Sequence, residues 1–248
     1  MAKILLVLLL FVRLLQPARG QAADTPEKYL ARIRSVVASE PLGSSVVQRL
    51  DSLVAKHIPS RSYLNGQFNR DLDVGFKQRR LVISLNFYRF QVNLLCRNDT
   101  IFLSTIDSEE DKKCSDHRYN HLLVVAFLQK RNEFYQSAQT AEQLLLDIAS
   151  PREFAFYCGD GSPLTADGAM INQLVAKRKA APLLAMLASF NCETQAYGVA
   201  GLQQLQRRGY RLPAASQALL DYIKARNSEL VTCSGCFAGL VRKIYDQP

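Results

Sequence analysis

The spacing of apolar residues changes along the chain, from a helical period near the start to strict alternation in the middle. Between residues 25 and 39, Tyr29 and Ile33 belong to one apolar stripe, and Thr25 followed by a proline is typical of a helix start. The segment 45–56 repeats the helical spacing. The N-terminal region therefore predicts two amphipathic helices.

Alternation marks the next region as β-structure. Apolar and polar residues alternate over 81–94, with a shift of one residue near Tyr88 that predicts a bulge or a bend. A turn at 97–100 and a second alternating run at 101–106 complete an antiparallel hairpin. The segment 63–72 also fits a strand, although its period is less clear.

The middle of the chain is less regular. Residues 108–117 predict a charged loop, and the apolar run 121–128 fits either a buried strand or a helix. The segment 140–143 matches a capping box that begins a helix ending at Ser150, and 154–157 fits a short strand. A glycine-rich loop then closes the first half.

From residue 165 onward the pattern is helical. Four helices are expected, over 167–179, 181–190, 193–208 and 214–227. The fold class that follows is α+β, with N-terminal helices and an antiparallel β-hairpin or small sheet, then a C-terminal α-helical part. We expect an α+β part at 23–160 and a helical part at 161–248, either as two units or as one continuous domain.

One pair of these helices resembles a known repeat. Residues 182–187 and 193–205 are similar to one helical hairpin of the HEAT type. Small residues that would let the helices approach closely are Ala196, Gly198, Ala200 and Gly201. The resemblance implies a binding surface, because HEAT stacks offer extended ones. An ordinary antiparallel helix pair is the alternative.

The first 22 residues have the features of a signal peptide. Lys3 precedes an apolar run from Ile4 to Val12, and small residues follow at Ala18, Gly20 and Ala22. A membrane-spanning helix needs about 20 apolar residues, which is about twice this run. We therefore expect residues 1–22 to be removed and a soluble mature protein, secreted or periplasmic, without a membrane span. An uncleaved N-terminal anchor is the alternative.

Charge narrows the choice of partners. The formal net charge of +9 falls to +6 once the three cations of residues 1–22 are removed. The remaining basic residues occur as separate groups at 79–80, 112–113, 130–131, 177–179 and 207–208. A nucleic-acid-binding protein usually has a denser basic stripe with aromatic residues, so no nucleic acid is expected. Weak attraction to anionic lipid, polysaccharide or cell-wall polymer stays open.

Six cysteines remain after processing. They are Cys96, Cys114, Cys158, Cys192, Cys233 and Cys236. An even number in an exported chain favours disulfides, although the sequence does not choose among the pairings.

The Cys233-Ser234-Gly235-Cys236 motif has three interpretations. A helix beginning at Cys233 would lower its thiol pKa and permit thiol–disulfide exchange. Four thiolates, from Cys158, Cys192, Cys233 and Cys236, would suit a structural zinc ion. The favoured interpretation is structural: a local loop, or bridges to distant partners such as Cys158 or Cys192.

Two further sites deserve a test. Cys114, His117 and His121 would share one face of a helix and could bind a metal, but a bridge between Cys96 and Cys114 is preferred. Asn98 begins a glycosylation sequon on a predicted exposed turn.

No catalytic or cofactor motif is recognisable. The chain has no Gly-x-Ser-x-Gly elbow, no His-Glu-x-x-His, no phosphate-binding glycine loop and no dinucleotide fingerprint. We expect an exported binding or scaffolding protein with a protein or polymer partner and no cofactor. The alternative is a thiol–disulfide or zinc-site protein that uses Cys233 and Cys236. A hydrolase with His117 or His121 beside carboxylates in a deep pocket is a third hypothesis, so enzymatic activity stays open.

Overall fold

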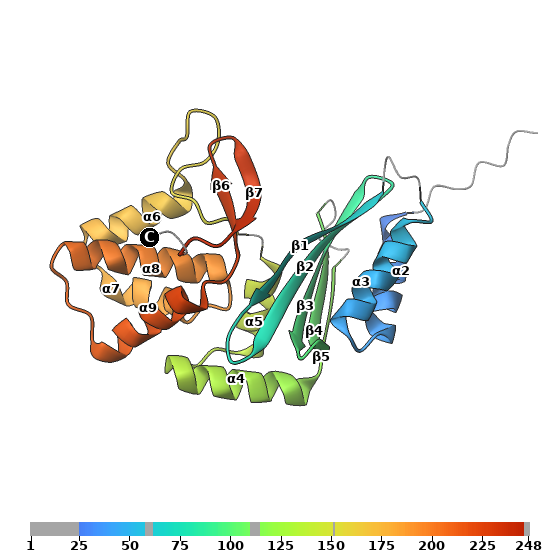
Figure 1. Ribbon diagram of the computed structural model, residues 1–248, viewed down its shortest axis with the longest axis horizontal. Coiled ribbons are helices and arrows are strands. Elements are labelled where there is room, and N and C mark those ends of the chain that lie inside the picture. The colour runs from blue at the N-terminus through green and yellow to red at the C-terminus, as the bar shows by residue number, and fades with distance from the viewer. Residues whose placement is uncertain (1–24, 58–61, 110–114, 151, 246–248) are drawn as a thin grey trace, which may run out of the picture.

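The computed structural model describes residues 25–57, 62–109, 115–150 and 152–245. The expected signal peptide, residues 1–22, and Cys114 lie outside these ranges. The described chain forms a five-stranded antiparallel sheet, a separate two-stranded sheet and eight helices, most of the C-terminal half being helical (Figure 1). The mixed α+β class is confirmed.

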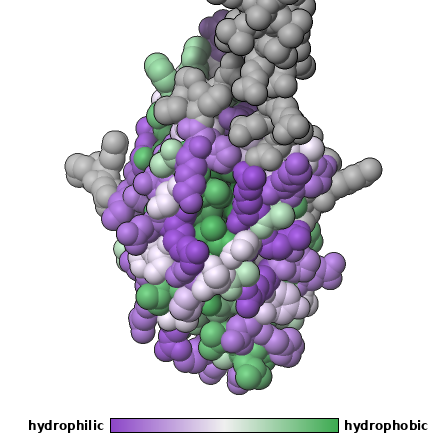
Figure 2. Space-filling view, turned by 90° about the vertical axis from the view of Figure 1, so that its right-hand side faces the viewer, coloured by the Kyte–Doolittle hydropathy of each residue, from purple (hydrophilic) through white to green (hydrophobic). Residues whose placement is uncertain are grey.

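The two N-terminal helices cover one face of the large sheet. Helix α2 (Pro26–Ser39) and helix α3 (Gly43–Val54) turn their apolar stripes toward the strands, as their spacing predicts. Tyr29, Ile33 and Leu50 are fully buried in this cluster. The outward face of this layer is mostly hydrophilic, with one narrow apolar strip (Figure 2).

The large sheet is a simple meander. Its strands lie in chain order, each antiparallel to the next. They are β1 (Tyr63–Asp71), β2 (Phe76–Leu85), β3 (Tyr88–Arg97), β4 (Thr100–Ser108) and β5 (Ser115–Tyr119). The strand at 63–72 is thus present, and the charged segment 108–117, expected as a loop, contributes to β4 and β5.

The expected single strand over 81–94 is wrong, because the chain reverses direction in its middle. Asn86 and Phe87 have φ angles of 49° and 79° and form a two-residue hairpin turn between β2 and β3. The phase shift near Tyr88 marks this turn and not a bulge. The sequence gives little sign of a turn at these two positions, because phenylalanine rarely adopts a positive φ angle. The turn expected at 97–100 is confirmed.

Both ambiguous segments of the middle region are helical. The run 121–128 begins helix α4 (His121–Tyr135), where the Asn120 side chain accepts a hydrogen bond from the Leu123 amide. The capping box at Thr140 is confirmed and begins helix α5 (Ala141–Ala149). These two helices pack on the second face of the large sheet (Figure 1).

The C-terminal half contains the four expected helices. They are α6 (Ala166–Ala176), α7 (Ala180–Leu187), α8 (Cys192–Arg207) and α9 (Ala214–Arg226). A Cβ atom added at Gly198 would lie 2.9 Å from the Leu183 carbonyl oxygen, so the close approach of α7 and α8 requires glycine there. The close packing is confirmed, and membership of the HEAT class stays a prediction.

A second hairpin ends the described chain. Strands β6 (Leu230–Ser234) and β7 (Phe237–Arg242) pair antiparallel, beyond the last expected helix and within the part expected to be helical, 161–248. The short strand expected at 154–157 is reduced to isolated bridges, one of which joins Phe154 to Thr232 of β6. The helical part beyond residue 160 therefore also contains a small sheet. Within the described ranges, no helix has both the length and the apolar character to cross a bilayer.

Buried ion pairs join the large sheet to the helical half. Arg70 of β1 donates two hydrogen bonds to the carboxylate of Glu193 on α8, at 2.5 and 3.2 Å, and both side chains are fully buried. Glu193 also accepts from the Val231 amide at 2.9 Å. Asp73 pairs with Arg131 at 2.9 Å and with Arg226. These pairs fix β1, α4, α8 and α9 in one arrangement.

Replacing Glu193 with glutamine should lower the free energy of unfolding by about 3–5 kcal/mol, because the Arg70 charge would stay buried without a carboxylate. Urea denaturation measures the change. The matched control is Asp71→Asn, which breaks the exposed Lys77–Asp71 pair of 3.5 Å and should cost less than about 1 kcal/mol. Equal losses for the two variants would contradict the role of the buried pair.

Candidate functional site

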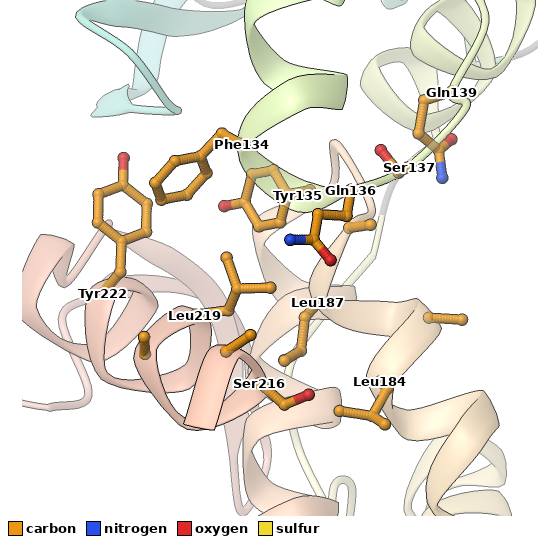
Figure 3. Close-up of a pocket in the computed structure, with 14 residues that line it drawn as sticks. Phe134, Tyr135, Gln136, Ser137, Gln139, Leu184, Leu187, Ser216, Leu219 and Tyr222 are labelled. Atoms are coloured by element: carbon orange, nitrogen blue, oxygen red, sulfur yellow. The ribbon is translucent and has the colours of Figure 1, made fainter. Parts of the chain in front are cut away.

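An apolar groove lies between helices α7 and α9 of the C-terminal half and the end of α4. Its volume is about 650 Å³, and its labelled side chains point toward one another from the end of α4, from α7 and from α9 (Figure 3). Fourteen residues line it: Phe134, Tyr135, Gln136, Ser137, Gln139, Leu184, Ala185, Leu187, Ala188, Ala215, Ser216, Ala218, Leu219 and Tyr222. Its size lies within the range of small-molecule and peptide sites.

Alanines create the groove. Helix α7 presents Ala185 and Ala188, three residues apart, and helix α9 presents Ala215 and Ala218 with the same spacing. Residues three apart share one face of a helix, so each wall has two short side chains in a row. These side chains cannot fill the space between the helices. Leu187, nearly fully buried, contributes to the floor.

Aromatic rings form the opposite wall. Phe134 stacks edge to face on Tyr222 at 4.7 Å and on Tyr135 at 5.0 Å between ring centroids. The Tyr135 hydroxyl donates a 2.8 Å hydrogen bond to Asp73, within the network that joins the halves. Burial, followed by the charge of Asp73, raises the pKa of Tyr135, so the hydroxyl stays neutral at physiological pH. The wall is therefore aromatic and uncharged.

The lining residues are uncharged. None of the fourteen is a histidine, cysteine, carboxylate, lysine or arginine; the hydroxyl groups that line the groove belong to Tyr135, Tyr222 and two serines. Polar contacts come from amides and hydroxyls at the rim, including Gln136 and Ser216 (Figure 3). Such groups orient a bound partner. The third hypothesis, a hydrolase with a histidine in a deep pocket, gains no support from this groove.

The Cys-x-x-Cys motif does not pair with itself. Cys233 forms a disulfide with Cys158, with the Cα atoms 5.5 Å apart, and Cys236 is free and exposed. The motif lies at the β6–β7 turn, where Gly235 has a φ of 58°, and not at a helix start. The expected lowering of the Cys233 pKa by a helix dipole therefore does not apply. The favoured interpretation, a bridge to a distant partner, is confirmed for Cys158.

The zinc interpretation is wrong for this arrangement, because two of its four thiolates are bonded to each other. Glu153, Cys158 and Cys233 lie together, within 4.8 Å of one another, but the two sulfurs form the disulfide. Cys192 lies elsewhere: it is buried and its sulfur is 3.9 Å from an Arg226 nitrogen.

The bridge expected between Cys96 and Cys114 does not form, because Cys96 is a free thiol. Its sulfur packs against the start of α3, where a Cβ added at Gly43 would lie 3.1 Å away. Burial raises the pKa of Cys96 to about 11, so the thiol stays protonated and unreactive. Cys114 itself lies outside the described residues.

The histidine pair is not assembled as a metal site. His117 is on strand β5 and His121 opens helix α4, so they do not share the face of one helix. Neither belongs to a metal-binding group found among the described residues. Asn98 occupies the exposed turn between β3 and β4, as its sequon predicts.

Comparison with known proteins adds no family to this geometry. No protein-family model matches the chain, and neither the curated proteins nor the solved structures give a significant match. The interpretation of the groove therefore rests on the residues that line it. Sequence reasoning missed it, although one signal was present: helix α7 is apolar on nearly all sides, which is unusual for a helix on the surface.

Alkylation under native conditions should modify Cys236 and leave Cys96 and Cys192 unmodified until the protein is unfolded, because Cys236 is exposed and the other two free thiols of the described residues are buried. Non-reducing peptide mapping by mass spectrometry should recover Cys158 and Cys233 in one linked pair. Recovery of a Cys233–Cys236 pair as the main species would contradict the arrangement described above.

Proposed function

We propose that this chain is a non-catalytic binding protein that holds an amphipathic helix of a partner protein in the groove between α4, α7 and α9. One observation carries the proposal: an open apolar groove of about 650 Å³ with two alanine rows and an aromatic wall. The uncharged lining requires an apolar face on the partner.

The spacing of the alanines favours a helix as the bound segment. A helix inserts its large side chains between small residues that recur every three or four positions on its neighbours. Ala185 with Ala188, and Ala215 with Ala218, provide two such rows. A partner helix with apolar residues at i, i+3 or i+4, and i+7 would match them. A small enclosed ligand fits less well, because the groove is open.

The compartment is part of the same proposal. A disulfide between residues 75 positions apart is typical of a protein that folds outside the reducing cytosol. Together with the signal-like residues 1–22, it supports a secreted or periplasmic protein that binds or scaffolds other exported proteins.

Selection of ligands from a displayed library of helical peptides tests the groove directly. The enriched peptides should have apolar residues on one helical face. Ala185→Trp and Ala218→Trp should each weaken their binding by at least about tenfold, because an indole would fill the space that the peptide occupies. Both alanines are exposed, so the substitutions leave the core intact.

The matched control is Ala176→Trp on α6, an exposed alanine outside the groove. It should bind the selected peptides as the parent does. Enrichment of peptides without a helical apolar face, or equal binding by all three variants, would contradict the proposal.

Thiol–disulfide exchange is a second candidate, favoured by the exposed Cys236 three residues after a bridged cysteine. The Cys236 thiolate would attack the Cys233 sulfur and displace Cys158 as a thiolate. One disulfide replaces another, so no external oxidant is needed. Alkylation at rising pH should then label Cys158, and Cys236→Ser should abolish that labelling. Persistent protection of Cys158 would remove this candidate.

A further inference from the structure

Two basic groups that are separate in the sequence meet at one end of the helical half. They comprise six exposed cations at the ends of α6 and α8 and in the loop after α8. These are Lys177, Arg178, Lys179, Arg207, Arg208 and Arg211.

The direction of the helices brings the groups together. Helices α6 and α8 pack on each other (Figure 1). Helix α7, which connects them in the chain, is antiparallel to both, so α6 and α8 run in the same direction. A Cβ atom at Gly201 would touch both Ile171 of α6 and Leu183 of α7. The two helices continue from this contact in the same direction and end within two turns. The axes of packed helices lie about 10 Å apart, which is about one Debye length at physiological salt. Each group of cations therefore contributes to the electrostatic potential at the other.

Acidic side chains are few around this charge: Asp221 of α9 is linked to Gln206 in the last turn of α8 through Gln217. Between residues 168 and 220 the only acidic residue is Glu193, which is fully buried and paired with Arg70. In the described part of the chain, none of the six cations forms an ion pair with a carboxylate. This surface, here called the basic end, therefore has six cations and a clear excess of positive charge before any partner binds.

The basic end lacks apolar anchors. From residue 177 to residue 213 every large apolar side chain is buried or half-buried, and Tyr210 and Leu212 pack inward against the helical core. Adsorption to a bilayer gains strength from inserted apolar residues, and binding of single-stranded nucleic acid gains strength from exposed aromatic rings. Neither is present, so ion pairing is the recognition chemistry that remains.

We infer that the basic end binds a linear anionic polymer with a phosphate or sulfate group on successive units. Lysine and arginine bind such groups by charge-assisted hydrogen bonds, and the field of six clustered cations attracts a chain of anions strongly at low salt. This site is distinct from the apolar groove and does not depend on the function proposed for it.

Salt dependence gives a quantitative test with inorganic polyphosphate as the probe. If all six cations contact the polymer, the slope of log K against log salt concentration should be about −4, a roughly 300-fold loss of affinity from 0.05 to 0.2 M. The triple variant Lys177→Gln/Lys179→Gln/Arg208→Gln should bring the slope to about −2. Fluorescence anisotropy with labelled polyphosphate measures both, and circular dichroism verifies that the variant is folded.

The matched control removes three exposed cations elsewhere, in Lys56→Gln/Lys130→Gln/Lys243→Gln, and should keep the slope of the parent. Dextran sulfate should compete with polyphosphate, and uncharged dextran should not. Equal slopes for the two triple variants would overturn the inference. So would stronger competition by phosphatidylglycerol vesicles than by dextran sulfate at equal concentrations of anionic groups, because the partner would then be a lipid surface.

Discussion

The fully buried ion pair between Arg70 and Glu193 is the contact on which the arrangement of the two halves depends. Arg70 belongs to β1, an edge strand of the large sheet, and Glu193 to the first turn of α8, 123 positions later. The pair is costly to separate, because both side chains are fully buried and each charge would lose its partner. Glu193 also accepts from Val231, so the same carboxylate holds the second hairpin in place.

A second polar centre extends this constraint to the groove. Asp73 accepts from Arg131 and Tyr135 of α4 and from Arg226 of α9. These two helices form opposite walls of the groove, so one carboxylate at the end of β1 sets their separation. A binding surface built on fixed helices needs little reorganisation when a partner binds, which favours affinity. The polar interior thus supports the apolar site.

Particular elements show how far the sequence could predict this fold. The stripe of α2, the capping box at Thr140 and the small residues facing α7 were readable, because each depends on neighbours within a few positions. The turn at Asn86 and Phe87 was not, since it lacks glycine and resembles a shift of phase. Hairpin β6–β7 was missed because its short strands form only against each other and Phe154. The all-round apolar character of α7 is the one local sign of the groove, and the Cys158–Cys233 bridge has none.

The sequence by itself determined the α+β class, most helix positions and the close packing of α7 on α8. Helical period, capping residues and glycine act over short distances, so they are legible without the fold. Tertiary structure alone decided which cysteines meet, that four alanines face an open groove and that six cations form one basic end. Each of these features joins residues from different helices or strands. Their proximity follows from packing directions and from the buried Arg70–Glu193 and Asp73 contacts, which no local pattern encodes.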